Sequence, residues 1–398
     1  LMKHVIRLLD GMADYPIPAL CDKTPLEYAR TPHMDKMFQK GTGGMVKNVP
    51  DSLAPGSAVA NLSVLGYDPE KYFTGRSPIE AASMGVPLKD TDIAARCNLI
   101  TLSDEPIYED KTLVDYCADE ISSEEAAFLI KALNEELNLS DMRFYPGISY
   151  RHLFVWGNGP TNMQLTPPHD ITGKKITNYL PSDPVALKIM KESHDVLKKH
   201  PVNLSRMEKG LNPANSIWFW GAGKKTVLPS FESKYGMKGA VIAAVDLVQG
   251  IGVCAGMDVL KVKGATGNFN TDYSGKAKAC IEGLRNGYDF VFVHIEAPDE
   301  CGHRNEVMNK VRSIELIDEK IVGPVLAELE QYDDFKIMAL ADHPTPLSVR
   351  THTRDAVPFT VYKKGDCGNG TLPFTEENAA KTGIFYEKGV FLAESFMR

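Results

Sequence analysis

The chain has no surplus of basic residues, and this limits the partners that it can bind. Its 398 residues contain 44 Lys and Arg against 52 Asp and Glu, a formal net charge of -8 at pH 7. Because nucleic-acid binding depends on neutralising many phosphates, this balance argues against a nucleic-acid partner. A small anionic substrate is not excluded, since it needs only a local group of Arg and Lys side chains.

Patterned cysteines and long apolar runs are also absent. The seven Cys are scattered and include no Cys-x-x-Cys pair, which is typical of reduced thiols in a cytosolic protein. No apolar run approaches the roughly 20 residues that a membrane helix needs, and the first residues lack the charged and apolar regions of a signal peptide. We therefore expect a cytoplasmic protein without a membrane partner. The sequence leaves the oligomeric state open.

A recognised nucleotide-binding loop is missing as well. Residues 221–226 read Gly-Ala-Gly-Lys-Lys-Thr. There is no Gly five positions before Gly223, and Lys224 is not followed by Ser or Thr, as a phosphate-binding loop requires. The glycines of residues 250–256 have the wrong spacing for a dinucleotide fingerprint.

Size and patterning indicate an α/β protein of two domains, because 398 residues exceed the usual size of one compact core. In residues 1–88 and 215–398, short apolar strands alternate with helical patterns, which predicts a mostly parallel sheet with helices on both faces. Residues 89–214 combine strand-like stretches, a helix and a hairpin around Pro146 and Gly147. We interpret them as a smaller α+β domain inserted into the first.

The strand expected at residues 335–340 organises the candidate site, and a long helix over about residues 306–331 leads into it. The apolar run ends at Asp342 and His343, and Pro344 then breaks the element. At the end of a strand both side chains can reach one point at the carboxyl edge of the sheet, where open α/β folds place their ligands. Imidazole together with carboxylate suits Zn²⁺, Mn²⁺ and related ions.

Two further strand ends carry donors of the same kind. Asp10 directly follows the strand expected at residues 4–9. Asp299 and His303 follow the strand expected at residues 289–294 and are four residues apart, so they lie on one side of a helical turn and can chelate one ion.

Ser57 begins the helical pattern of residues 57–66, after a loop rich in Pro and Gly. The sequence allows two interpretations. Ser57 is either a capping serine, or a nucleophile at a helix N-terminus, where free N–H groups and the helix dipole favour an oxyanion or phosphate. His352 lies in a polar loop near the chain's end, and we expect Asp14, in the loop after Asp10, to be solvated.

Taken together, these side chains predict one site with two metal positions, each with His and carboxylate ligands. Two ions about 3.5 to 4 Å apart are a standard arrangement for phosphoryl chemistry. The candidate residues are Asp10, Ser57, Asp299, His303, Asp342, His343 and His352.

At these positions the chain resembles the archaeal-type cofactor-independent phosphoglycerate mutase family of the alkaline phosphatase superfamily. The agreement runs over nearly the whole chain. The matching segments are Asp10-Gly11, the Ser57 loop, Tyr150-Arg151-His152-Leu153, residues 239–252, Gly264-Ala265-Thr266-Gly267, residues 293–300, Asp342-His343-Pro344-Thr345-Pro346 and Thr351-His352-Thr353.

The resemblance implies an alkaline-phosphatase-like fold and a division of the metal ligands. Asp10, Ser57, Asp342 and His343 would hold one ion, while Asp299, His303 and His352 would hold the other. In the better-studied mutases Asn precedes the nucleophilic serine, whereas Gly56 does so here. One polar contact to the phosphate is therefore expected to come from elsewhere.

The resemblance also implies an activity. The enzyme would interconvert 3-phosphoglycerate and 2-phosphoglycerate through a phosphoserine, using two divalent ions and no 2,3-bisphosphoglycerate. Mn²⁺ or Zn²⁺ suits several imidazoles best, with Co²⁺ or Mg²⁺ as further candidates. The family includes bacterial members proposed to be homoserine kinases, and a phosphatase or phosphodiesterase would use the same metal residues, so these alternatives stay open.

The inserted domain is expected to act as a lid, because suppressing hydrolysis of a phosphoserine requires that water be excluded. Arg suits a bidentate grip on carboxylate or phosphate. The candidates that would bind a small phosphorylated substrate are Arg96 and Arg151, with Asn98 and His152 beside them. A surface or packing role is an equal alternative for each.

Overall fold

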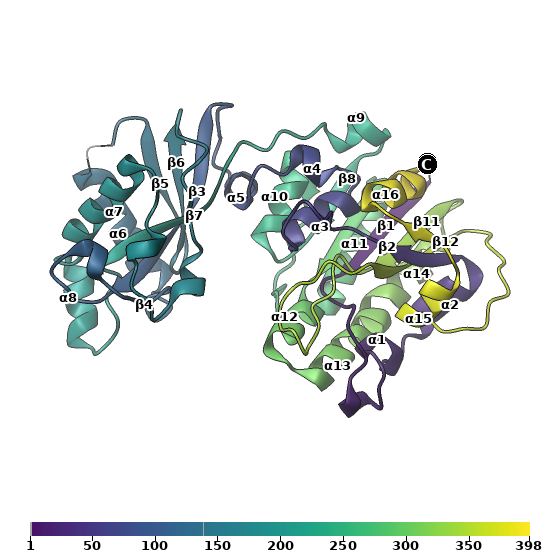
Figure 1. Ribbon diagram of the computed structural model, residues 1–398. Coiled ribbons are helices and arrows are strands. Elements are labelled where there is room, and N and C mark those ends of the chain that lie inside the picture. Colours follow the sequence, from purple (N-terminus) through teal and green to yellow (C-terminus); the bar gives the residue numbers. More distant parts are fainter. Residues whose placement is uncertain (1, 138) are drawn as a thin grey trace. The chain divides into compact units, whose positions relative to one another are not determined.

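The computed structural model describes residues 2–137 and 139–398. The chain forms two compact units, which we call unit 1 (Leu1–Phe73 and Val227–Arg398) and unit 2 (Thr74–Thr226) (Figure 1). The boundaries expected after residues 88 and 214 both fall inside unit 2. The reason is that helix α5 (Arg76–Ser83) packs on strands β3 (Asp92–Leu102) and β7 (Ser216–Lys224) of that unit.

Unit 1 is built on an eight-stranded sheet in the order β13-β2-β12-β11-β1-β10-β8-β9. Only β12 runs antiparallel to its neighbours β11 and β2, and the other pairs are parallel. The expected α/β class with a mostly parallel sheet is therefore confirmed. The strands are β1 (Lys3–Leu9), β2 (Thr42–Val46), β8 (Gly239–Ile242), β9 (Asp258–Val259), β10 (Phe290–Ile295), β11 (Phe335–Leu340), β12 (Val357–Lys363) and β13 (Phe385–Tyr386).

The three central strands carry the site. Strand β1 lies between β10 and β11, with Leu9 opposite Ile295 and Leu8 opposite Leu340. All residues of β1 and β10 are buried, as expected for parallel strands that are covered on both faces, and β1 buries Lys3, His4 and Arg7 among its apolar residues. Because the three strands end level with one another, the residues that follow them meet at one edge of the sheet.

Helices connect and cover these strands. The long helix expected over about residues 306–331 is present from Val307 to Leu329, and it contains one π-helical turn, η5 (Asp318–Val322), between α13 and α14. The helices of unit 1 are η1 (Pro18–Leu20), α1 (Pro25–Tyr28), α2 (Pro32–Lys40), α3 (Ser57–Val64), α4 (Pro69–Tyr72), α9 (Phe231–Tyr235), α10 (Asp246–Cys254), α11 (Tyr273–Arg285), α12 (Ala297–Arg304), α13 (Val307–Ile317), α14 (Gly323–Leu329), α15 (Glu376–Lys381) and α16 (Gly389–Met397).

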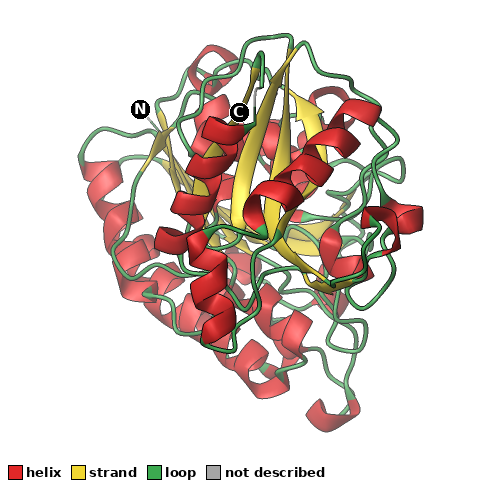
Figure 2. Cartoon of the chain, turned by 90° about the vertical axis from the view of Figure 1, so that its left-hand side faces the viewer, coloured by secondary structure: helices red, strands yellow, loops and turns green. Residues whose placement is uncertain are grey.

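Unit 2 has an antiparallel sheet in the order β4-β3-β6-β5, with β7 on the other side of β3. Figure 2 looks onto this unit from the side on which long helices lie across the strands. Besides β3 and β7 the strands are β4 (Leu113–Asp115), β5 (Met142–Ile148) and β6 (Arg151–Gly157). Besides α5 the helices are η2 (Tyr108–Asp110), α6 (Ser123–Glu136), η3 (Pro168–Ile171), η4 (Thr177–Tyr179), α7 (Pro184–Leu197) and α8 (Pro201–Glu208).

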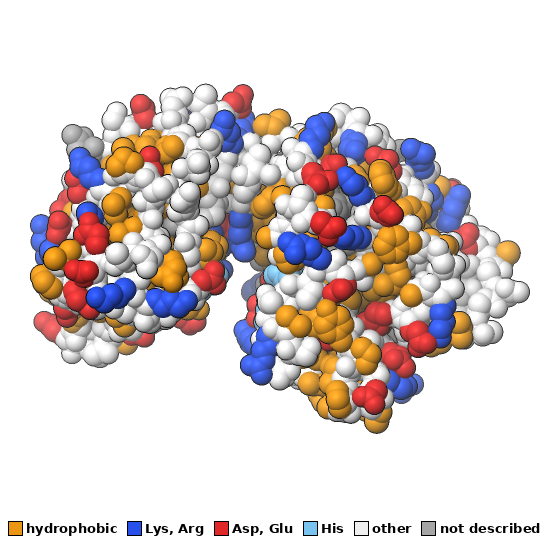
Figure 3. All heavy atoms as spheres, in the orientation of Figure 1, with side chains coloured by type: hydrophobic (Ala, Val, Ile, Leu, Met, Phe, Trp, Pro, Cys, Tyr) orange, Lys and Arg blue, Asp and Glu red, His pale blue; other side chains and the backbone are white. Residues whose placement is uncertain are grey.

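Acidic and basic side chains alternate over the visible surface of each unit (Figure 3). Among the described residues, no helix combines the length and the apolar character of a membrane span.

Candidate metal centre

The ends of β1 and β11 bring the first group of donors together. Asp342 Oδ2 lies 3.2 Å from His343 Nε2, and Asp10 Oδ1 lies 3.7 Å from the same nitrogen. All three side chains are buried. Each offers a donor atom within 4.8 Å of the other two, a spacing that could hold a metal ion.

A second group forms around Asp299, on the first turns of α12. His303 Nε2 lies 3.2 Å from Asp299 Oδ2, and His352 Nε2 lies 3.5 Å from Asp299 Oδ1. Asp299 and His352 also share a possible metal position with His343, whose ring centroid is 4.1 Å from that of His352. His343 therefore stands where the two groups meet.

Ser57 begins α3 beside the first group. Gly56 occupies the N-cap position of this helix, so Ser57 is not its capping residue. Ser57 Oγ lies 3.2 Å from His343 Nε2. The side chain of Asn61, one turn later, donates to the Ser57 carbonyl at 2.8 Å and to Asp342 Oδ2 at 3.3 Å, which ties the start of the helix to the end of β11.

Several carboxylates lie close together in the site, and their negative charges act on one another. Burial raises the pKa of Asp10, and the nearby carboxylates of Asp342, Asp299 and Glu296 raise it further. Asp10 Oδ1 is buried and makes no hydrogen bond in the described structure. Such a concentration of negative charge is costly unless a cation compensates it.

Several supporting residues were not anticipated from the sequence. His294 Nε2 lies 2.9 Å from Asp10 Oδ2, and burial lowers its pKa to about 4. Glu296 offers a carboxylate to a third possible group with Asp10 and Asp299. His294 is the last residue but one of strand β10, and a polar residue at the end of an apolar strand was a signal in the sequence that could have identified it.

Asp14 is the clearest error of the sequence interpretation, which had it solvated. Its carboxylate is buried and accepts a hydrogen bond from Lys310 Nζ at 2.7 Å. Lys310 Nζ also donates to the Thr345 carbonyl at 2.9 Å, and the Thr345 hydroxyl donates to Asp299. This chain of contacts connects α13 to the loops that carry the donors.

The four expected substrate-binding residues lie in unit 2, and three of them share one face of its sheet. Asn98 is paired with Arg151 across β3 and β6, and Arg96 is two residues from Asn98, so all three point to the same side. Asn98 Oδ1 accepts from Trp220 Nε1 at 2.9 Å. His152 is buried on the opposite side of the sheet, where burial lowers its pKa to about 3. Their roles in binding remain predictions.

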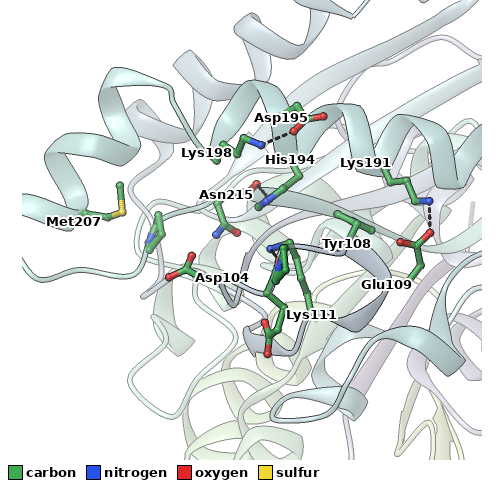
Figure 4. A pocket seen from close by; sticks show the side chains of 13 residues that line it. Asp104, Tyr108, Glu109, Lys111, Lys191, His194, Asp195, Lys198, Met207 and Asn215 are labelled. Atoms are coloured by element: carbon green, nitrogen blue, oxygen red, sulfur yellow. Dashed lines mark hydrogen bonds and ion pairs between the residues drawn. The ribbon is translucent and has the colours of Figure 1, made fainter.

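Unit 2 also contains a hollow of about 580 Å³ between α7 and the loop before β4 (Figure 4). Its lysines already have partners. Lys191 pairs with Glu109, Lys198 pairs with Asp195, and Lys111 Nζ donates to two backbone carbonyls. The hollow therefore adds no lysine that is free to bind an anion among its described lining residues, and we assign it no role.

The donors of unit 1 fit divalent metal ions. Imidazole nitrogens and carboxylate oxygens are combined at a short spacing, and Asp10 Oδ1 is buried without a partner, as expected for a ligand atom. The fold and this site thus define an α/β protein with a buried cluster of imidazole and carboxylate donors beside a serine that begins a helix.

Comparison with known proteins identifies the family. A family model described as 2,3-bisphosphoglycerate-independent phosphoglycerate mutase matches residues 39–203. A protein of that name from Methanosarcina mazei is 50% identical over 387 residues, which is 96% of this chain and 96% of the relative. The chain belongs to the 2,3-bisphosphoglycerate-independent phosphoglycerate mutase family.

Two solved structures support the fold assignment. The PH0037 protein from Pyrococcus horikoshii aligns with a TM-score of 0.83 and 30% identity, covering 100% of this chain and 97% of that one. The cofactor-independent phosphoglycerate mutase from Thermoplasma acidophilum aligns with a TM-score of 0.69 and 25% identity, covering 100% and 99%. The resemblance inferred from the sequence motifs is confirmed at the level of the family.

Proposed function

We propose that this enzyme interconverts 3-phosphoglycerate and 2-phosphoglycerate without 2,3-bisphosphoglycerate. The observation that carries the proposal is the Ser57 hydroxyl, which is 3.2 Å from His343 Nε2 at the start of α3 and adjoins the donor groups of three strand ends. Relatives that match nearly the full length of the chain bear the name of this activity.

The reaction has two phosphoryl transfers. Ser57 loses its hydroxyl proton as Oγ attacks the phosphorus of 3-phosphoglycerate, the bond from phosphorus to the C3 oxygen breaks, and that oxygen takes up a proton. The 2-hydroxyl of the retained glycerate then loses its proton and attacks the phosphorus of the phosphoserine. The bond from phosphorus to Ser57 Oγ breaks, and Oγ takes a proton back. Passage through the serine is needed because the 2- and 3-oxygens of one small molecule cannot align in line on a single phosphorus.

Two divalent ions complete the site in this proposal. Asp10, Ser57, Asp342 and His343 would hold one, and Asp299, His303 and His352 the other. When bound, the ions lower the pKa of the serine hydroxyl and offset the negative charge of the phosphoryl group. Mn²⁺ or Zn²⁺ fits this mixture of nitrogen and oxygen donors best.

Residues of the chain also have to retain the glycerate and exclude water between the two transfers. We assign this task to unit 2, with Arg96, Asn98 and Arg151 as the residues that bind the anion. His152 is a weaker candidate, because its buried ring is neutral and faces away from the other three.

The decisive experiment follows the phosphate. The metal-loaded enzyme is incubated with 3-phosphoglycerate alone, the products are measured by ³¹P NMR, and phosphate on Ser57 is sought by mass spectrometry after acid quenching. We expect 2-phosphoglycerate and a phosphoserine that is absent from Ser57→Ala. If neither forms, while ATP and homoserine give a phosphorylated product, the mutase assignment is wrong.

A further inference from the structure

One carboxylate in unit 2 joins two guanidinium groups. Glu80 Oε1 accepts a hydrogen bond from Arg76 Nε at 2.6 Å, and Glu80 Oε2 lies 3.2 Å from Arg96 Nε. The side chains of Glu80 and Arg96 are 10% and 9% exposed, whereas that of Arg76 is 41% exposed. A nearly buried carboxylate thus holds one guanidinium within the unit and one at its surface.

Both arginines use Nε for this contact, which leaves their Nη groups available. In the described structure no residue accepts a hydrogen bond from the Nη atoms of Arg76 or Arg96. The guanidinium of Arg96 lies over the ring of Trp220, 4.7 Å from its centroid. This stacking and the bond to Glu80 fix the plane of the guanidinium, so that its remaining N–H groups are preorganised for an acceptor.

The cluster carries an excess of positive charge. Arg151 lies on the same face of the sheet as Arg96, and the charges of Arg76 and Arg151 both act on Arg96. Three guanidinium groups therefore stand against the single carboxylate of Glu80. A cluster of this kind suits a ligand with several acceptor oxygens and negative charge, such as a carboxylate or phosphate group.

We propose that Arg76 is a further substrate-binding residue and that Glu80 is a positioning residue, which aligns Arg76 and Arg96 to grip an oxyanion group of phosphoglycerate. The inference rests on the proposed function for the identity of the ligand, but the site itself is defined by the geometry of unit 2. Neither residue is a metal-ligand candidate, and neither was singled out from the sequence.

The Glu80→Gln variant tests the proposal, because its two explanations predict opposite changes in the affinity for an anion. The substitution removes a negative charge beside the ligand, so charge alone predicts tighter binding of an anion. If Glu80 positions the two guanidinium groups, binding instead becomes weaker. We expect the dissociation constant of 3-phosphoglycerate to rise about tenfold, because two charged hydrogen-bonding groups lose their alignment.

Arg76→Lys separates geometry from charge. A lysine can pair with Glu80 or reach the ligand, but it has no planar fork with which to do both. We expect this variant to weaken binding about 10- to 100-fold, although the net charge is unchanged. Equal affinities for Arg76→Lys and the parent protein would overturn the assignment of Arg76.

Binding is measured on the full chain with Ser57→Ala to prevent turnover and with the metals removed, so that the donors of unit 1 do not dominate. Trp220 supplies a fluorescence signal beside Arg96, and calorimetry gives an independent value. D-glycerate, inorganic phosphate and 3-phosphoglycerate are compared, which shows whether the cluster binds the carboxylate or the phosphate. Glu125→Gln is the matched control, since Glu125 pairs with Arg206 at 2.8 Å in the same unit.

Turnover distinguishes failure of this inference from failure of the proposed function. In the metal-loaded enzyme with intact Ser57, Glu80→Gln and Arg76→Lys should raise the KM for 3-phosphoglycerate while metal content and melting temperature match those of Glu125→Gln. If the parent enzyme converts 3-phosphoglycerate but both variants retain its KM and binding constants, the inference is wrong and the function stands. If the parent does not convert it, the function is wrong.

Discussion

The Nε2 atoms of His303 and His352 face each other at 3.1 Å. The other ring nitrogen of His303, Nδ1, lies 3.0 Å from the carbonyl oxygen of Arg350 and must donate its proton there. The hydrogen bond to Asp299 raises the pKa of His303 to about 9, so the ring of the metal-free protein is protonated and Nε2 donates to the Asp299 carboxylate, 3.2 Å away. The Asp299 carboxylate thus already draws one positive charge to this point, and a divalent ion bound there would take the place of the proton on Nε2.

Loss of His352 should remove about one equivalent of bound metal. The His352→Ala variant leaves Asp299 and His303 without their third donor, and the nearby imidazole of His343 is assigned to the other ion. We expect nearly complete loss of activity, with metal content measured by inductively coupled plasma mass spectrometry. His200→Ala is the control, because His200 accepts a hydrogen bond at the start of α8, in unit 2. Full metal content with normal turnover in His352→Ala would contradict the two-metal assignment.

Arg151→Ala should weaken the retention of glycerate more than phosphoryl transfer to Ser57. Arg151 is exposed on the face of the sheet that also carries Arg96, so its removal should not disturb the core. We expect the variant to release free phosphate from 3-phosphoglycerate at the expense of 2-phosphoglycerate, as a colorimetric phosphate assay would detect. Unchanged mutase flux without added hydrolysis would show that Arg151 has no part in retention.

Lys310→Met should destabilise unit 1 by about 3–5 kcal/mol, because it leaves the buried carboxylate of Asp14 without its cation. Thermal and denaturant unfolding of the metal-free protein would measure this loss. The double variant with Asp14→Asn should recover part of it, since the isolated charge is then gone. If the double variant were as unstable as the sum of the single variants, the pair would not be coupled.

Glu376 should make the stability of the metal-free protein depend on pH. Burial raises the pKa of its carboxyl group to about 7 from an ordinary value of 4.5. The folded state therefore binds this proton more tightly than the unfolded state, and stability is lost as the pH rises from about 4.5 to 7. The Glu376→Gln variant should lack this part of the loss, on the order of 1–3 kcal/mol, when chemical denaturation is compared across that range. Parallel profiles for both proteins would exclude Glu376 as the source.

The strand ends were predictable because the signal for each is local. An apolar run that stops at Asp10, or at Asp342 and His343, reveals both a buried parallel strand and the edge at which it ends. Level strand ends then bring side chains together that are more than 300 residues apart in the sequence. For these donors, the residue types at the strand ends were enough to predict that the side chains lie close together.

The support around the donors could not be predicted in the same way. The contact of Asp14 with Lys310 joins residues separated by 296 positions, and nothing near Asp14 distinguishes it from a solvated loop residue. Glu80 is likewise an ordinary acidic residue on a short helix until β3 brings Arg96 against it. His152 and its neighbour Arg151 point to opposite faces of the sheet. The hairpin expected from the sequence did not show which face each residue takes.

The interruption of unit 1 by unit 2 has a consequence for synthesis on the ribosome. Residues 74–226 are continuous and form their own compact unit, so they can fold as soon as they emerge. The first 73 residues cannot complete their sheet at that time, because β1 must wait for β10 and β11, more than 280 residues later. The metal-binding residues are also synthesised at different times: Asp10 and Ser57 come first, and His352 comes close to the end of the chain. A metal ion that binds the complete set of donors therefore stabilises the folded state of unit 1, in which the first and last parts of the chain are packed together.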